Sequence, residues 1–517
     1  MTIRHALISV CLSSTVAVGA FDPTAPPPPT TPDTAIVGAT VIDGNGGPPL
    51  ADASLVVHGN RILSVGPRSG VQIPAQATII DGRGKFLLPG LIDTNVHMSP
   101  ISDELTYARY WPQLEDLVLQ GLQTELAFGL TSVRDTYGPL PPMIAVRDRI
   151  ARGEAAGPRT YLAGNIVGWG GPYSRTVNGT GEGTLNFFQE QMNDFFTQGS
   201  GEELIAMTPD ELRVAINRYL DKGVNFIKYG GSTEVGPPYL ILFSPRAQQV
   251  IVDETHKRGL PVETHAKGLE ALRLSILAGV DLIQHPEAAG ERLLTDELVH
   301  MIVERRMICS LLPNKYTGRI WKLASDAQAR AAAAQQDPSI RRIPATSAEI
   351  RRRVAATGKP DPATVYVEDL FSRRANAKKL IEAGAIVTVG ADTLLFGRPG
   401  VTPEFLRTDH AVPEHLEPGI GTIVAIEGLV EMGMSPSQAI VAATKNGALA
   451  CRASKDVGTL EAGKLADVLV LAKDPLADIG NLRSLELVVK NGVSMDPKTL
   501  PVHPVTSSWR SNRPPVH

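Results

Sequence analysis

Eight short apolar segments alternate with helix-like stretches through the middle of this 517-residue chain. The segments are rich in Val, Ile and Leu, as buried strands are, and stretches such as PDELRVAINRYLDKG between them carry helical spacing. The candidate strands cover residues 86–97, 131–136, 159–164, 225–230, 262–266, 281–286, 308–312 and 385–393. A repeated strand–helix unit of this length predicts an α/β fold, a (β/α)8 TIM barrel over residues 86–450.

The two ends of the chain share a different pattern. Residues 35–85 contain AIVGATVID and SLVVHGNRILSVG, and residues 451–500 contain KLADVLVLAKD and LELVVKNGVSM. Both alternate β-branched and polar residues between Gly, Asn and Asp turns, which is typical of short antiparallel strands. We therefore expect both ends to form one small, discontinuous β-sandwich domain beside the barrel.

The extreme termini carry targeting and linker signals. Residues 1–20 combine a short polar start, the apolar run ALISVCLSSTVAVGA and small residues at the end, which predicts a signal peptide and a periplasmic or secreted protein. Residues 21–34 form a Pro-rich linker, and residues 501–517 form a polar C-terminal tail. The apolar run is too short to span a bilayer, and no other stretch predicts a membrane span.

The composition excludes several classes of function. The net charge is −4 and no basic patch stands out, so we expect no nucleic-acid partner. The three cysteines share no metal-like spacing and do not predict a disulfide framework. The partner that we expect is a small-molecule substrate, as the polar residues at the strand ends indicate.

Polar residues gather where the predicted strands end. The stretch FLLPGLIDTNVHM ends in Asn95 and His97, which share one face of a strand because side chains alternate. Later strand ends carry Lys228, His265, His285 and Asp392. Taken alone, each residue has an explanation without a metal: Lys228 could be a solvated lysine, each histidine could be structural, and Asp392 could cap the next helix. Together, at the edge where barrel enzymes hold their active sites, they predict a metal site.

The same residues resemble the amidohydrolase superfamily, in its imidazolonepropionase- and prolidase-like branch. PGLIDTNVH is similar to the superfamily motif PGLIDxHxH, and GTLEAGKLADVLVL is similar to its C-terminal closing motif. The resemblance spans residues 35–495. It implies the barrel, a hydrolase and a divalent metal, and it says little about the substrate.

The resemblance also implies a role for each strand-end residue. His97 and Asp392 would bind one metal, His265 and His285 a second position, and Lys228 would form a carbamate with CO2 that binds one metal or bridges two. One or two zinc ions per chain are expected. Asp392 would also take a proton from the attacking water, which a divalent metal acidifies. Burial favours the neutral lysine that carbamate formation needs.

Asn95 departs from the superfamily pattern, which has histidine at that position. Asn95 either ligates the metal through its amide oxygen or only forms a hydrogen bond to a neighbour. The Asn-x-His variant resembles that of the phenylurea hydrolases and molinate hydrolase, which cleave urea and thiocarbamate bonds. This narrower resemblance includes IVGWGGPYS after the third strand.

Three hypotheses for function follow from these residues. The first is a metal-dependent hydrolase of a non-peptide C–N bond in an amide, urea or carbamate. Trp169 and the Phe-rich insertion of residues 168–207 suggest an apolar or aromatic substrate group, and Tyr137 is a candidate for the pocket lining. Tyr229 is a further candidate, although alternation directs it away from Lys228. The second is a prolidase-like dipeptidase, which would need Arg175 as the anchor for a carboxylate. The third is a non-catalytic binding protein on a metal-free barrel. The resemblance also implies a homo-oligomer.

Overall fold

The computed structural model describes residues 33–99, 104–179, 183–236, 238–290, 292–326, 362–395 and 414–505. The expected signal peptide, nearly all of the Pro-rich linker and most of the C-terminal tail lie outside these residues. Within them, no helix has both the length and the apolar character needed to cross a bilayer.

Parallel strands form the centre of the molecule, in two sheets with the orders β14-β6-β7-β8 and β13-β12-β11-β10-β9. Each segment expected to be a central strand contains one of them. The strands are β6 (Leu91–His97), β7 (Leu130–Asp135), β8 (Arg159–Leu162), β9 (Ile227–Gly230), β10 (Val262–His265), β11 (Leu282–Gln284), β12 (Ile308–Leu311), β13 (Ile386–Val389) and β14 (Thr393–Leu394).

Backbone hydrogen bonds join the two parallel sheets at both of their edges. On one side, Val167, just past β8, accepts from Gly230 and donates to the carbonyl of Lys228 at 2.8 Å. On the other side, Asp392, just past β13, donates to the carbonyl of Asn95 in β6 at 2.7 Å. The carboxyl ends of strands from both sheets therefore face one region.

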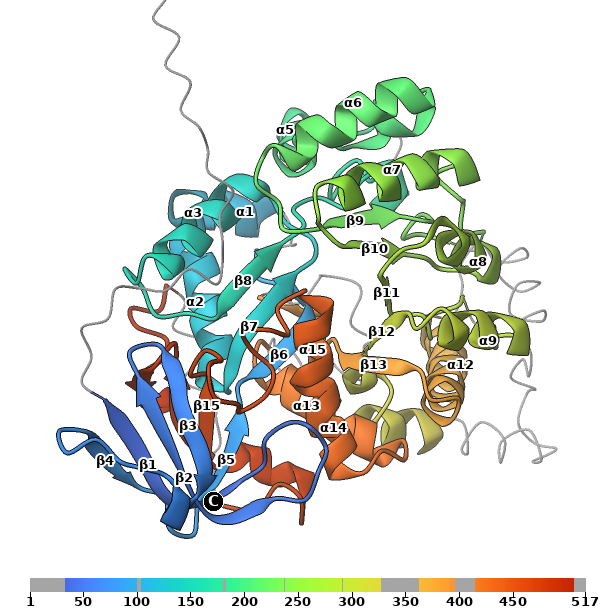
Figure 1. Ribbon diagram of the computed structural model, residues 1–517. Coiled ribbons are helices and arrows are strands. Elements are labelled where there is room, and N and C mark those ends of the chain that lie inside the picture. Colours follow the sequence, from blue (N-terminus) through green and yellow to red (C-terminus); the bar gives the residue numbers. More distant parts are fainter. Residues whose placement is uncertain are drawn as a thin grey trace, which may run out of the picture.

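Helices follow most of the parallel strands, and Figure 1 shows α7, α8 and α9 on their outer side. Several begin at a Ser or Thr cap followed by Pro, as at Thr208, Ser244 and Ser435, whose side chains accept backbone N–H groups of the first turn. The helices are α1 (Glu104–Tyr110), α2 (Leu114–Ala127), α3 (Leu140–Ala151), α4 (Arg175–Asn178), α5 (Phe187–Thr197), α6 (Pro209–Leu220), α7 (Pro245–Lys257), α8 (Leu269–Ala278), α9 (Asp296–Glu304), α12 (Pro362–Glu382), α13 (Ile420–Glu431), α14 (Pro436–Ala443) and α15 (Lys445–Ala450).

The two chain ends meet in one eight-stranded sheet with the order β17-β16-β15-β5-β1-β2-β3, in which β4 also pairs with β1. In Figure 1 the blue N-terminal strands and β15 lie side by side. The strands are β1 (Thr34–Val41), β2 (Leu50–His58), β3 (Arg61–Pro67), β4 (Thr78–Asp81), β5 (Phe86–Pro89), β15 (Val468–Leu471), β16 (Leu485–Lys490) and β17 (Val493–Met495).

One boundary differs from the expectation. We expected a single strand over residues 86–97, but the chain breaks at Gly90. Residues 86–89 form β5, which pairs with β1 and β15 in the sheet of the chain ends, and only β6 belongs to the parallel sheet. A side chain at Gly90 would lie 2.0 Å from Oγ1 of Thr131 in β7, so this crossing point requires glycine.

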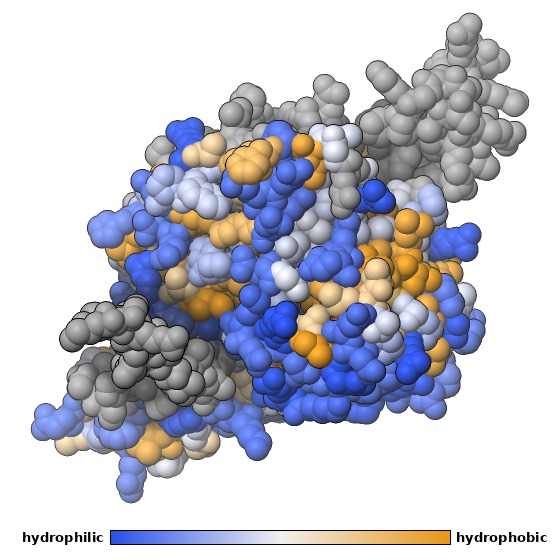
Figure 2. Space-filling model, turned by 90° about the horizontal axis from the view of Figure 1, so that it is seen from above, coloured by the Kyte–Doolittle hydropathy of each residue, from blue (hydrophilic) through white to orange (hydrophobic). Residues whose placement is uncertain are grey.

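A buried ion pair connects the two sheet systems. Arg159 of β8 donates to Asp467, just before β15, at 2.8 Å, and both side chains are almost fully buried. The outer surface is mostly hydrophilic with separate hydrophobic patches, as Figure 2 shows for one face. The large apolar clusters lie inside, between the parallel strands and their helices and under the sheet of the chain ends.

Candidate active site

A pocket of about 330 Å³ lies at the carboxyl ends of the parallel strands. Five of the six residues that we expected to hold a metal line it: His97, Lys228, His265, His285 and Asp392. They come from β6, β9 and β10 and from the residues just past β11 and β13. The sixth, Asn95, does not line the pocket.

His265 and His285 lie side by side in the pocket lining, with ring centroids 4.6 Å apart. Burial lowers the pKa of His265 to about 4 and that of His285 well below its usual value, so both rings are neutral near pH 7. Nδ1 of His285 is buried without a hydrogen-bond partner among the described residues. His285 also has a left-handed backbone (φ 38°), a conformation that is unfavourable for a non-glycine residue.

Lys228 reaches the pocket from the middle of β9. Its side chain is buried, and Nζ donates to Oγ1 of Thr136 at 3.0 Å. Burial lowers the pKa of this amine, although the carboxylates of Glu263 and Asp392 oppose that shift. A larger neutral fraction makes the amine a better nucleophile toward CO2.

Asn95 lies behind the pocket wall. Its Oδ1 accepts a hydrogen bond from Oγ1 of Thr136 at 2.5 Å, and its side chain is completely buried. Thr136 therefore links Asn95 to Lys228 through two hydrogen bonds. We expected Asn95 either to bind a metal or to form a hydrogen bond to a neighbour, and in this geometry it forms the hydrogen bond to Thr136.

Asp392 has both carboxylate oxygens engaged. Oδ1 lies 2.7 Å from Nε2 of His97, and Oδ2 forms an ion pair with Nζ of Lys315. Burial alone would raise the pKa of this carboxyl group, but the Lys315 charge and the His97 contact outweigh it and hold the pKa well below its usual value. Like His285, Asp392 has a left-handed backbone (φ 50°).

The histidines of the pocket would need a further ligand from another residue type to hold a metal. Among the described residues, no three His, Cys, Asp or Glu side chains lie close enough together to hold an ion. Two neutral imidazoles 4.6 Å apart, one with an unsatisfied nitrogen, are suitable ligands. A carbamate on Lys228 would add oxygen donors from the neighbouring strand. The residues that would hold a divalent metal are therefore His265, His285 and, once carbamylated, Lys228.

Aromatic side chains form one wall of the pocket. Trp169 lies with its ring centroid 4.6 Å from that of His265, and Tyr137 contacts His97 and Trp169 edge to face. Tyr229 does not line the pocket. Its hydroxyl donates to Oε1 of Gln248 on α7, on the opposite side of β9, because neighbouring strand residues face opposite ways. The expectation that Tyr229 contacts substrate is corrected accordingly.

Three cations in the pocket were not predicted from the sequence. Each is paired with a carboxylate that also lines the pocket: Lys267 with Glu234 at 2.8 Å, Lys315 with Asp392, and Arg373 with Asp369 at 2.6 Å. Lys267 follows His265 by two residues, so strand alternation could have indicated it. Lys315 and Arg373 come from a turn and a helix, and no periodic signal marks them.

Arg175, expected as an anchor for a substrate carboxylate, is exposed at the start of α4 and does not line the pocket.

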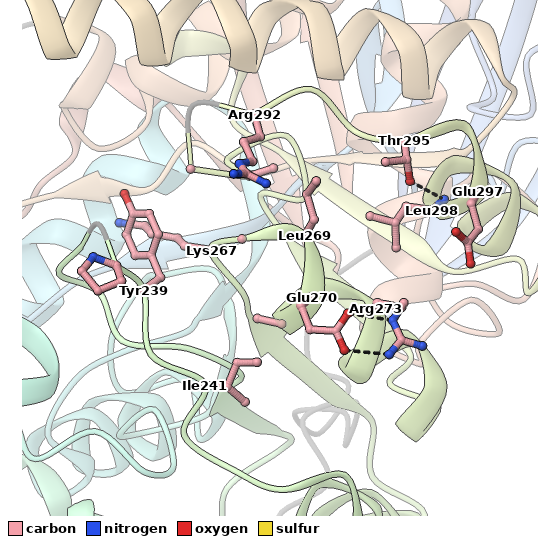
Figure 3. A pocket seen from close by; sticks show the side chains of 15 residues that line it. Tyr239, Ile241, Lys267, Leu269, Glu270, Arg273, Arg292, Thr295, Glu297 and Leu298 are labelled. Atoms are coloured by element: carbon pink, nitrogen blue, oxygen red, sulfur yellow. Dashed lines mark hydrogen bonds and ion pairs between the residues drawn. The ribbon is translucent and has the colours of Figure 1, made fainter. Parts of the chain in front are cut away.

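A second, more open hollow of about 760 Å³ adjoins the same strand ends. Figure 3 shows Tyr239, Leu269, Arg292 and Leu298 around it, with an ion pair between Glu270 and Arg273. Lys267 lines both hollows. The larger one contains none of the predicted metal-binding residues, so the smaller pocket is the candidate site.

The sequence and the structure resemble those of known proteins. A model of the amidohydrolase family matches residues 86–495. Imidazolonepropionase from Geobacillus sp. (strain WCH70) is 28% identical over 211 residues, which are 38% of this chain and 43% of that protein. The chain thus spans less than half the length of this curated relative.

Solved structures match over nearly the whole chain. Molinate hydrolase is 29% identical, with a TM-score of 0.77 over 92% of this chain and 97% of that one. Phenylurea hydrolase B is 27% identical, with a TM-score of 0.76 over 92% of this chain and 99% of that one. A putative prolidase from Bifidobacterium longum is 26% identical, with a TM-score of 0.62 over 90% of this chain and 95% of that one.

Proposed function

The chain belongs to the amidohydrolase family, and we propose that it is a metal-dependent hydrolase of a C–N bond in an uncharged amide, urea or carbamate. The observation that carries this proposal is the convergence of His97, Lys228, His265, His285 and Asp392 on one pocket. The similarity to molinate hydrolase and phenylurea hydrolase B supports the class of bond.

In this proposal His265, His285 and Lys228 hold a divalent metal, with zinc as the first candidate. Lys228 acts as a carbamate: its neutral amine adds to the carbon of CO2, a C–N bond forms, and one proton leaves to solvent. The lowered pKa of Lys228 supports this step. A bound metal would supply polarisation of the scissile carbonyl and acidification of water.

The chain's own residues carry the proton. The carboxylate of Asp392 is ionised, faces the pocket and accepts a proton from the attacking water. It then gives that proton to the leaving nitrogen, so that an amine and an acid are released. His97 holds Oδ1 of Asp392 and fixes the direction of the carboxylate.

The charges of the pocket favour a neutral substrate. Lys267, Lys315 and Arg373 each already have a carboxylate partner, so a substrate carboxylate would have to displace one of them. The rings of Tyr137 and Trp169 offer an apolar wall to a flat group.

A prolidase-like dipeptidase is the second candidate. The similarity to the putative Bifidobacterium longum prolidase favours it. The position of Arg175 outside the pocket weakens it, because that residue was the expected anchor for the dipeptide's carboxylate. Arg373 or Lys315 would have to exchange its internal partner for the substrate.

Hydrolysis assays on the metal-loaded protein distinguish these functions. The panel is an N-aryl urea, an aryl carbamate, and Xaa-Pro and Xaa-Arg dipeptides, each with and without a chelator. We expect chelator-sensitive release of the amine from the urea or the carbamate. Turnover of dipeptides alone would favour the prolidase-like function, and a protein that takes up no metal and turns over nothing would support the binding-protein hypothesis.

We propose that the two parallel sheets are arcs of one (β/α)8 barrel, which the hydrogen bonds at Val167 and Asp392 support.

We also propose that the sheet of the chain ends is a separate small domain, that residues 1–20 direct export to the periplasm or the medium, and that the protein is a homo-oligomer. Fractionation and light scattering test export and assembly.

A further inference from the structure

The ammonium group of Lys315 contacts Asp392, the carboxylate that moves the proton in the proposed reaction. Lys315 belongs to a short 3-10 turn after β12, Pro313–Lys315, and its Nζ binds Oδ2 of Asp392. Neither the resemblance nor the strand pattern assigned this residue.

The structure holds the Lys315 turn firmly on both sides. Before it, Nδ2 of Asn314 donates to the carbonyls of Ala391 at 2.7 Å and His415 at 2.6 Å. After it, the hydroxyl of Tyr316 donates to the buried carboxylate of Glu287 at 3.0 Å. The side chains of Asn314 and Tyr316 are both buried, so the backbone of Lys315 between them is held in place. Ala391 directly precedes Asp392, and Asn314 therefore fixes the lysine and its carboxylate partner to each other.

The ion pair limits what Asp392 can bind. Oδ1 of Asp392 faces Nε2 of His97 and Oδ2 faces Nζ of Lys315. Each oxygen keeps a second lone pair that can accept a hydrogen bond from water, but a metal on either oxygen would have to displace or crowd its present partner. A metal would also have to approach an ammonium group in a pocket that screens charge poorly. His265, His285 and Lys228 lie on the other strands and do not contact Lys315 by any described bond. The described partner of Nε2 of His265 is the carboxylate of Glu234 at 3.1 Å, whose charge attracts a cation instead of repelling it.

We propose that Lys315 is a positioning residue that reserves Asp392 for proton transfer. Its ammonium group occupies Oδ2, keeps the carboxylate directed into the pocket and prevents a second metal from binding at His97 and Asp392. This inference rests on the proposed function for the proton-transfer step. It differs from the expectation that His97 and Asp392 bind a metal themselves.

The test compares Lys315→Met with Lys315→Arg, which keeps the positive charge, and with Lys322→Met, an exposed lysine seven positions later. Each protein is saturated with zinc, passed over a desalting column and analysed for zinc per chain by elemental analysis. kcat and KM are then measured on the neutral substrate with the highest turnover. Circular dichroism confirms that each variant is folded.

We expect one zinc per chain in the wild type, Lys315→Arg and Lys322→Met, and two in Lys315→Met. We also expect kcat of Lys315→Met to fall at least about tenfold while KM changes little, with partial rescue in Lys315→Arg. An unchanged zinc content in folded Lys315→Met would overturn the inference, and so would a second zinc without loss of kcat. The zinc count is read even if no substrate is hydrolysed, so failure of the proposed function is seen separately, in the wild type.

Discussion

The imidazole rings of His265 and His285 lie 4.6 Å apart at the ends of the neighbouring parallel strands β10 and β11. Parallel strands in register bring their carboxyl ends to one edge, so two residues far apart in sequence meet there. Because burial keeps both rings neutral, they are ready to accept a metal without first losing a proton.

Replacing His285 with Ala is expected to abolish tight metal binding. The change removes one of the two neutral nitrogen ligands, so kcat/KM should fall by more than about 100-fold, together with the metal content. Elemental analysis and the hydrolysis assay measure both. His300→Ala, an exposed histidine on α9, is the matched control and should behave as the wild type. Full metal content in His285→Ala would contradict the assignment.

Metal uptake is expected to require CO2, because the proposed third ligand is a carbamate on Lys228. Metal-free protein in degassed buffer should bind metal poorly, and added bicarbonate should restore binding. Lys228→Met should not respond to bicarbonate. Titration calorimetry measures the metal affinity with and without bicarbonate. Equal affinity in both buffers would argue against the carbamate.

Trp169→Ala is expected to weaken binding of aryl substrates. The indole ring forms part of the pocket wall beside His265, and losing it should raise KM about tenfold with a smaller effect on kcat. A short alkyl analogue should show little change. Phe187→Ala, at an exposed aromatic on α5, is the control. An equal effect of Trp169→Ala on aryl and alkyl substrates would show that the ring supports the fold rather than the substrate.

Asp135 is expected to make the stability of the metal-free protein depend on pH. Burial raises the pKa of its carboxyl group from 3.8 to about 7. Between these values the folded state keeps the proton and the unfolded state releases it, so the free energy of unfolding falls as pH rises from about 4 to about 7. Asp135→Asn removes this dependence. The stability difference between the two proteins should change by about 4 kcal/mol over that range in urea titrations. If the difference in the free energy of unfolding between the two proteins does not change with pH, the pKa of Asp135 is not raised.

The buried ion pair beneath the pocket is expected to be sensitive to removal of one partner. Arg134 of β7 donates to Glu263 of β10 at 2.5 Å, and both side chains are buried. Glu263→Gln leaves the guanidinium group without its countercharge and should destabilise the fold by about 3–5 kcal/mol. Glu270→Gln, which breaks the exposed pair with Arg273, should have little effect. Chemical denaturation of both variants tests the contrast.

The strand-end residues could be predicted from sequence because strand geometry determines their direction. Alternation placed Lys228 toward the pocket and Tyr229 away from it, and the structure has both in these directions. The eight segments were recognisable because buried parallel strands are continuously apolar. The break at Gly90 was harder to interpret, since it depends on the pairing of β5 with β1 and β15 and of β6 with β7, which no local pattern reveals.

Residues from turns and helices outside the strands could not be predicted in this way. The direction of Lys315 depends on hydrogen bonds of Asn314 to two distant carbonyl groups, which no local pattern reveals. Thr136 likewise gains its importance from Asn95 and Lys228, on two other strands. Such contacts depend on the tertiary arrangement of the chain.

The metal site is tested best by a crystal structure of the zinc-loaded protein, with anomalous diffraction data on both sides of the zinc absorption edge. We expect one anomalous peak between His265 and His285, within bonding distance of a carbamate on Lys228, with Asp392 still paired to Lys315. A peak elsewhere, or no peak in protein that hydrolyses its substrate, would contradict this expectation.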